Sequence, residues 1–141
     1  MPVLYPSNEW CVEWKKAINQ SERCVEKGKN WGVGFNGNVI FELKPGGGLT
    51  KTTYVYLEAQ NGRCTSARLV NDPSEANAGF HAIGAYDDFK EVVKGKKDFI
   101  EGVVRGIFQL KGDMSKIMRN AQFIRAVADS ISSFEAEYLG E

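Results

Sequence analysis

The chain has 141 residues, of which 43% are hydrophobic and 26% are charged. These values are typical of one globular domain with its own core, and they exclude a disordered chain. The 18 basic and 18 acidic residues cancel, so the net charge is zero. Because nucleic-acid binders usually carry a basic excess that neutralises phosphates, we expect a single domain over residues 1–141 with no nucleic-acid partner.

Cysteine usage and the sequence of the N-terminus indicate the compartment. The three cysteines, Cys11, Cys24 and Cys64, are widely spaced, with no paired Cys or His spacing that would suit a metal. The sequence begins without the features of a secretory signal, and it has no apolar run long enough to span a membrane. We therefore predict a soluble cytoplasmic protein with reduced thiols, no metal and no other cofactor.

The first part of the chain has helical spacing. Its apolar positions recur at i, i+1, i+4, i+7 and i+8, which predicts a helix with one buried face that Ser7 caps. A second short helix is predicted over residues 21–27, with Gly28 after its end. The residues on the buried face of the first helix are Trp10, Cys11, Trp14, Ala17 and Ile18.

The apolar period then changes to two, which indicates strands. Residues 39–44 and 53–59 alternate and are separated by a glycine-rich turn. Asn61-Gly62 is a strong signal for a hairpin into a third strand over residues 63–70. We expect these three strands to form an antiparallel meander. Residues 31–35 also alternate, and they either begin the first strand or form a bulge in it.

The second half of the chain returns to helices. A strand over residues 78–83 precedes a helix that ends at Gly95, and Asp98 caps a short helix before a last strand over residues 107–110. The strongest periodicity comes last, because apolar residues recur at helical spacing for about six turns after Asp113, as far as Phe134. The pattern predicts an α+β fold with a long C-terminal amphipathic helix.

Several stretches resemble one known family. Gly84-Ala85-Tyr86-Asp87-Asp88-Phe89 forms a step from strand to helix, and after Gly95 a short helix leads to a strand that ends in Lys111-Gly112-Asp113 and opens directly into the last helix. This arrangement is similar to the signature of the sterol carrier protein type-2 family. The two N-terminal helices and the hairpin at Asn61-Gly62 also follow the order of the family, so the resemblance covers nearly the whole chain.

The resemblance implies both a fold and a function. The fold would be a mainly antiparallel five-stranded sheet covered by helices, enclosing an apolar tunnel. The function would be non-enzymatic binding and carriage of a hydrophobic ligand: a fatty acid, a fatty acyl-CoA or another lipid. Transient membrane contact and a homodimer are also compatible with the resemblance.

The predicted site is the lining of that cavity, since lipid cavities are mostly apolar with few polar groups. Its residues come from the aromatic side chains of the strands and helices and from the apolar stripe of the last helix, although ordinary core packing explains any one of them equally well. The predicted lining residues are Phe41, Tyr54, Tyr56, Phe80, Phe89, Phe99, Val103, Phe108, Met114, Ile117, Met118, Ala121 and Ile124.

Two other functions are open at this stage. The first is an interaction or lipid-sensing module on the same fold without transfer activity, and the second is an enzyme that acts on lipids. His81 is the only histidine and has no motif partner, so no catalytic residue is predicted. Lys94, Lys96 and Lys97 form a small basic cluster, which is either a solvated helix end or a contact for a lipid head group or a CoA phosphate.

Overall fold

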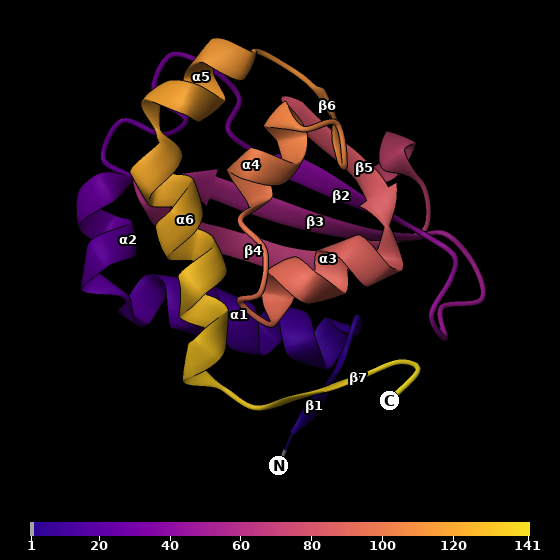
Figure 1. Cartoon of the computed structure of the whole chain (residues 1–141). Coiled ribbons are helices and arrows are strands. Elements are labelled where there is room, and N and C mark those ends of the chain that lie inside the picture. Colours follow the sequence, from indigo (N-terminus) through magenta and orange to yellow (C-terminus); the bar gives the residue numbers. More distant parts are fainter. Residues whose placement is uncertain (1) are drawn as a thin grey trace.

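The computed structural model describes residues 2–141 and begins with short elements at the N-terminus (Figure 1). These are β1 (Val3–Tyr5), α1 (Asn8–Gln20) and α2 (Glu22–Lys27). The Ser7 hydroxyl accepts a hydrogen bond from the Trp10 backbone N–H at 3.0 Å, and Ser21 caps α2 in the same way. Both predicted helices are therefore present, and the side-chain caps fix where they begin.

A five-stranded sheet forms the centre of the molecule, as predicted. It contains β2 (Val39–Lys44), β3 (Thr53–Gln60), β4 (Arg63–Val70), β5 (Phe80–Ala85) and β6 (Gln109–Lys111), in the spatial order β4-β3-β2-β5-β6. The predicted meander of β2, β3 and β4 is confirmed, with positive φ values of 55° at Asn61 and 80° at Gly62 in the hairpin turn. β2 and β5 pair in parallel, and the other pairs are antiparallel.

Residues 31–35 form turns and not a strand. The indole Nε1 of Trp31 donates a hydrogen bond to the Gly37 carbonyl oxygen at 2.8 Å, and only 2% of Trp31 is exposed. The alternating apolar residues of this segment therefore cover the core as part of a loop. The backbone of the segment is free to turn because Gly32 and Gly34 adopt positive φ angles.

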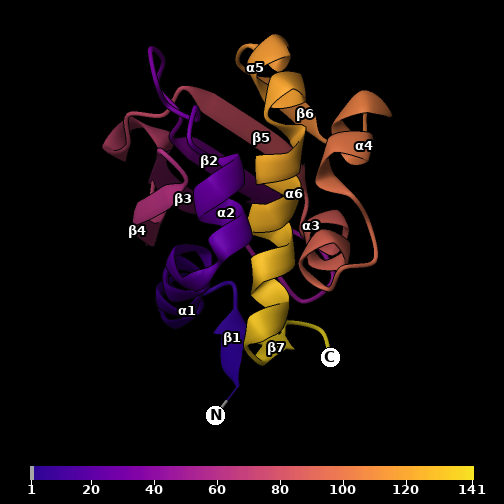
Figure 2. The same ribbon diagram turned by 90° about the vertical axis from the view of Figure 1, so that its left-hand side faces the viewer.

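Helices cover one face of the sheet. They include α3 (Tyr86–Val93), α4 (Phe99–Val104), α5 (Met114–Arg119) and α6 (Ala121–Asp129), which is followed by the short 3₁₀ turn η2 (Ser130–Ser133). A second 3₁₀ turn, η1 (Pro73–Glu75), lies in the loop after β4. Figures 1 and 2 show α3, α4 and α6 over the same face, while α1 runs beside the β4 edge of the sheet. An interior closed by helices on one side of a sheet is thus present.

The C-terminal helical region consists of three successive segments. α5 ends at Asn120, where φ is −111° and ψ is 26°, and α6 and η2 follow. The Asn120 side-chain amide donates to the Lys116 carbonyl oxygen at 2.8 Å. Such a local side-chain bond competes with continuation of the helix, which explains the break. Apolar periodicity passes through the break because both helices face the same interior.

The segments near the two ends of the chain form a small second sheet that the sequence did not predict. β1 pairs in parallel with β7 (Ala136–Tyr138), in a register that places Val3 opposite Ala136. Strands of three residues are too short to show a period of two, which is why no pattern indicated them. The pairing carries the chain that follows η2 back to the start of α1 (Figure 2).

Candidate functional site

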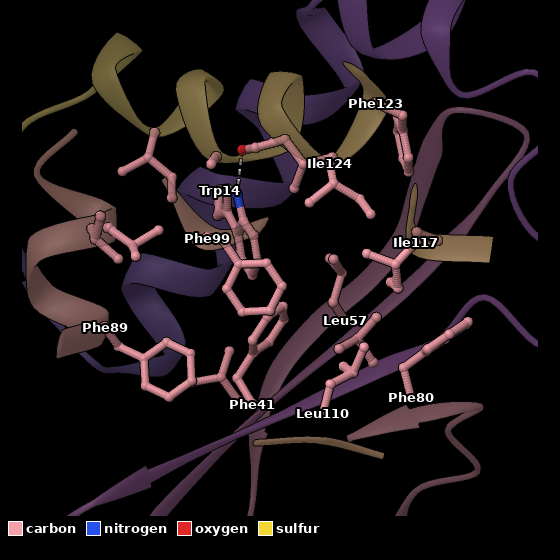
Figure 3. Close-up of a pocket in the computed structure, with 18 of the residues that line it drawn as sticks. Trp14, Phe41, Leu57, Phe80, Phe89, Phe99, Leu110, Ile117, Phe123 and Ile124 are labelled. Carbon is pink, nitrogen blue, oxygen red and sulfur yellow. Dashed lines mark hydrogen bonds between the residues drawn. The ribbon is translucent and has the colours of Figure 1, made fainter. Parts of the chain in front are cut away.

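An apolar cavity lies between the sheet and the helices (Figure 3). Its volume is about 90 Å³ in this conformation. Every residue in its lining is aliphatic or aromatic. The lining consists of Tyr5, Trp10, Trp14, Trp31, Val39, Phe41, Val55, Leu57, Ala59, Phe80, Phe89, Val92, Val93, Phe99, Leu110, Ile117, Phe123, Ile124, Val127, Ala128 and Ile131.

The sheet supplies one side of the cavity through neighbouring residues on three strands. Phe41 of β2 lies opposite Val55 of β3, and Val39 lies opposite both Leu57 of β3 and Phe80 of β5. Residues that pair across strands point to the same face, so the register brings these five side chains together. Figure 3 shows Phe41, Leu57 and Phe80 pointing into the space under the helices.

α6 supplies the opposite side. Phe123, Ile124, Val127 and Ala128 lie at i, i+1, i+4 and i+5, which places them on one stripe of the helix. The Trp14 indole Nε1 donates a hydrogen bond to the Val127 carbonyl oxygen at 3.2 Å, shown dashed in Figure 3. This buried bond fixes α6 against α1 and satisfies the polar group of a tryptophan that also lines the cavity.

Six of the thirteen predicted lining residues lie in the wall of this cavity. They come from β2, β5, α3, α4, α5 and α6, which are separated in sequence and converge in space. The six are Phe41, Phe80, Phe89, Phe99, Ile117 and Ile124. Phe41 is central among the aromatic residues, with its ring centroid 6.1 Å from those of both Phe89 and Phe99.

Tyr54 and Tyr56 lie on the opposite face of the sheet, outside the lining of this cavity. They alternate with the lining residues Val55 and Leu57, and the pleat therefore directs them away from the cavity. Tyr56 is nevertheless buried in the fold, with an exposed fraction of 2%, and its hydroxyl donates to the Asn77 carbonyl oxygen at 3.2 Å.

Phe108 lies in a second layer behind the lining. Its ring centroid is 4.5 Å from that of Phe89 and 5.3 Å from that of Phe99. A Cβ atom at Gly84 or Gly102 would come within 2.6 Å of the Phe108 ring, so both glycines are needed for this packing. Val103 on α4 is half-buried against the core and also lies outside the lining.

The remaining three predicted residues, Met114, Met118 and Ala121, also lie outside the lining. Met118 is 50% exposed, and Met114 and Ala121 are half-buried. The break at Asn120 contributes to this result, because α5 and α6 do not share one continuous stripe. Ile117 is the residue of α5 that reaches the cavity.

Several lining residues were missed although the sequence contained a signal for them. Val39, Val55, Leu57 and Ala59 belong to the alternating pattern, but the pattern alone did not show which face met the helices. Trp10, Trp14 and Val127 belong to apolar helical stripes, which core packing also explains. Trp31 and Phe123 belong to the aromatic residues typical of a lipid cavity, but no pattern placed them in the predicted lining.

The polar groups around the cavity are few. Among residues 2–141, the buried side-chain polar atom without a hydrogen-bond partner is Nε1 of Trp10. Burial raises the pKa of the Tyr5 hydroxyl far above its ordinary value, so this lining residue is neutral at physiological pH. The wall therefore presents no charge to a molecule inside it.

His81 lies away from the cavity, on the opposite face of the sheet. Its Nε2 is 2.9 Å from Oε1 of Glu42, while Lys44 contacts Oε2 of the same carboxylate. Burial alone would raise the pKa of Glu42, but the bonds from Lys44 and His81 outweigh burial and hold this pKa below its usual value. The cluster is a polar network separated from the apolar site by the thickness of the sheet.

The cysteines are free and buried. Burial raises the pKa of the Cys11 thiol to about 12 and that of the Cys64 thiol to about 11. Both thiols are therefore protonated and poor nucleophiles at neutral pH.

Clustered metal ligands and long apolar helices were both sought among the described residues. Across residues 2–141, no group of three or more His, Cys, Asp or Glu side chains is arranged to hold a metal ion. Over the same residues, no helix combines the length and the apolar character needed to cross a bilayer.

The sequence model of the SCP-2 sterol transfer family matches residues 19–125, about three quarters of the chain. The chain belongs to the SCP-2 sterol transfer family. No curated protein matches the sequence.

Solved structures of SCP-2 proteins share the fold. A crystal structure of sterol carrier protein 2 superposes with a TM-score of 0.79 at 22% identity, covering 91% of this chain and 97% of the other. A Thermus thermophilus protein described as a candidate sterol carrier protein gives 0.81 at 21% identity, covering 93% and 90%. The apo form of sterol carrier protein 2 from Yarrowia lipolytica gives 0.60 at 19% identity, covering 93% and 98%. The SCP-2 fold therefore extends over nearly the whole chain.

Proposed function

We propose that this SCP-2 protein binds a long-chain lipid, a fatty acid or its acyl derivative, in the cavity between the sheet and α6, and carries it without chemical change. The observation that carries the proposal is the wholly apolar lining, which has no charged side chain. Burying an acyl chain there contributes about 0.8 kcal/mol per methylene and needs no directional contact.

The size of the cavity sets a condition on binding. At about 90 Å³, it is smaller than the engineered cavity of about 150 Å³ that admits benzene in another protein. A long acyl chain therefore requires the side chains and at least one helix to move apart. Three phenylalanine rings of the lining, from β2, α3 and α4, have no hydrogen bond to hold them and are the side chains that would move first. They are Phe41, Phe89 and Phe99.

The small cavity also supports the second candidate, an interaction or lipid-sensing module on the same fold. In that case the interior stays closed and the protein acts through its surface. The exposed apolar residues Val104, Ile107 and Met118 are available for such contacts or for a membrane. Transient membrane contact, a homodimer and a cytoplasmic location are further parts of the proposal.

An enzymatic function receives less support. His81 lies on the other side of the sheet from the lining, and the thiols of Cys11 and Cys64 are protonated at neutral pH. A base and a nucleophile that converge on the cavity are not found among residues 2–141. We therefore favour a non-catalytic carrier.

Ligand uptake is the direct test. Native mass spectrometry of the purified protein should show bound lipid, and titration with oleic acid should change the fluorescence of the three tryptophans, all of which line the cavity. We expect dissociation constants in the micromolar range or below. A protein that takes up no acyl ligand at micromolar concentrations would favour the interaction module instead.

A pair of variants localises the binding. Ile124→Trp places a larger ring in the cavity and should weaken oleic acid binding at least about tenfold, because the substituted side chain occupies the space of the ligand. Met118→Trp is the matched control, since Met118 is 50% exposed and lies outside the lining. Thermal unfolding of both variants checks that the fold persists. Equal loss of binding in the two variants would place the ligand elsewhere.

A further inference from the structure

Some lining residues on α6 and at the end of α3 are only half-buried and so lie near the surface. On α6, the lining residues Ile124 and Ala128 are half-buried, whereas Val127 is buried. On the other side, Val93 at the end of α3 is also a half-buried lining residue. These partly exposed positions mark the rim of the cavity.

An ion pair joins the two sides of this rim. Arg125 of α6 donates from Nε to Oδ1 and from Nη2 to Oδ2 of Asp98, both at 3.2 Å. Arg125 directly follows Ile124 and lies three residues before Ala128, and Asp98 directly precedes Phe99. Both partners of the ion pair are therefore next in sequence to lining residues, one on each wall, and the guanidinium is half-exposed to solvent, with 47% of the Arg125 side chain accessible.

We propose that Arg125 binds the carboxylate of a fatty acid whose chain occupies the cavity, and that Asp98 holds the same position in the empty protein. The inference rests on the proposed function, because it names the ligand class and orientation at that site. The planar guanidinium of Arg125 already binds the Asp98 carboxylate through two parallel hydrogen bonds. The head group of a fatty acid is also a carboxylate and presents two oxygens in the same geometry.

The lining favours this orientation. A carboxylate inside the uncharged cavity would lose its hydration without a partner, which is strongly unfavourable. At the rim the carboxylate stays partly hydrated and gains a cation, while the chain points towards Phe41 and Leu57. Uptake of the fatty acid breaks the Arg125–Asp98 pair, so the same step that binds the head group also frees α4 from α6.

The alternative is that the Arg125–Asp98 ion pair only stabilises the packing of α6 against α4. The two ideas make opposite predictions for Asp98. Asp98 accepts a hydrogen bond from the Glu101 N–H at 3.1 Å as the N-cap of α4, and asparagine is an equally good cap. Asp98→Asn therefore keeps the cap and removes the carboxylate that competes for Arg125.

The experiment compares oleic acid with oleyl alcohol, which has the same chain and no charge. Both are titrated at about pH 8 through tryptophan fluorescence, into the wild type, Arg125→Gln, Asp98→Asn and the control Arg119→Gln, which changes an exposed arginine of α5 outside the lining. We expect Arg125→Gln to weaken oleic acid about fivefold, Asp98→Asn to tighten it by a similar factor, and Arg119→Gln to change it little. Oleyl alcohol should respond to none of the three.

The inference is overturned if the acid and the alcohol respond in parallel, or if Arg125→Gln and Asp98→Asn weaken binding alike. Both results are expected of an ion pair that only stabilises the packing of α6 against α4. Equal affinity of the wild type for the acid and the alcohol, with no effect of Arg125→Gln, overturns the inference and leaves the proposed function intact. Failure of the wild type to bind either ligand overturns both.

Discussion

The two faces of the central sheet have the same alternation of side chains and very different surroundings. The face that looks towards α6 carries Val39, Phe41 and Val55 and lines the cavity. The other face carries Glu42 and His81, with Tyr54 directly opposite Glu42 on the neighbouring strand. One residue along a strand therefore separates an apolar interior from a network of charges.

The comparison shows that burial alone does not define the site. Tyr56 and Ile40, which pair across strands on the outer face, are only 2% and 3% exposed. The guanidinium carbon of Arg68 lies 4.8 Å from the centroid of the Tyr56 ring, and Asn38 and Asn77 contact its hydroxyl. The outer face is thus covered by its own polar side chains and by the loop after β4, which contains the short 3₁₀ turn η1.

Neighbouring substitutions on β3 test the difference between the faces most strongly. Val55→Asp places a carboxylate among apolar side chains with no partner and should lower the free energy of unfolding by about 4 kcal/mol or more. Tyr54→Asp, one residue earlier on the half-buried outer face, should cost about 1 kcal/mol. Urea denaturation at neutral pH measures both. Similar losses would mean that the two faces are equally apolar in solution.

The network on the outer face should make stability depend on pH. The pKa of Glu42 is lower in the folded chain than the value of about 4.3 expected for an unfolded chain, so its ionised form stabilises the fold above that pH. This contribution is lost as the pH falls through the lower, folded pKa. Glu42→Gln should cost about 1 to 2 kcal/mol at neutral pH, because it removes charge-assisted bonds to Lys44 and His81.

The same variant should flatten the pH profile. Between about pH 5 and about pH 3, the wild type should lose stability more steeply than Glu42→Gln, as measured by thermal unfolding at each pH. A Glu42→Gln profile as steep as that of the wild type would assign the acid sensitivity to other carboxylates.

The smallest expected effect is the effect on ligand affinity of a substitution on the outer face. His81→Gln should leave the affinity for oleic acid unchanged within about twofold, since the side chain lies on the far side of the sheet from the lining. Its stability should fall slightly through the lost contact with Glu42. A strong loss of binding, or of any activity on a lipid substrate, would contradict the separation of the two faces and revive an enzymatic role for His81.

Local signals in the sequence predicted most of the elements. Strand 39–44 has the predicted bounds, and the predicted caps Ser7, Asp98 and Asp113 all accept hydrogen bonds from the first turns of their helices. Each of these features depends on residues within about four positions of one another. A single sequence is sufficient for such features because the chemistry of a cap or a hairpin turn is local.

Features that depend on distant partners were harder to predict. The parallel pairing of β2 with β5 decides that Phe80 joins Val39 on the cavity face, and nothing in either strand specifies it. Tyr54 and Tyr56 were chosen for the lining because aromatic residues are typical of lipid cavities, whereas the pleat places them outside. The break at Asn120 was hidden because the apolar residues on both sides of it face the interior.

The contacts of α6 also determine which wall can move. On one side the Trp14–Val127 hydrogen bond is buried, and Arg23 of α2 pairs with Asp129 at 2.7 Å. On the other side of α6 lies α4, a six-residue helix that contains Gly102 and has little stability of its own. Under the proposed function, the rate of lipid exchange should therefore follow the opening of α4, and variants that stiffen this short helix should slow both uptake and release while α6 remains in place.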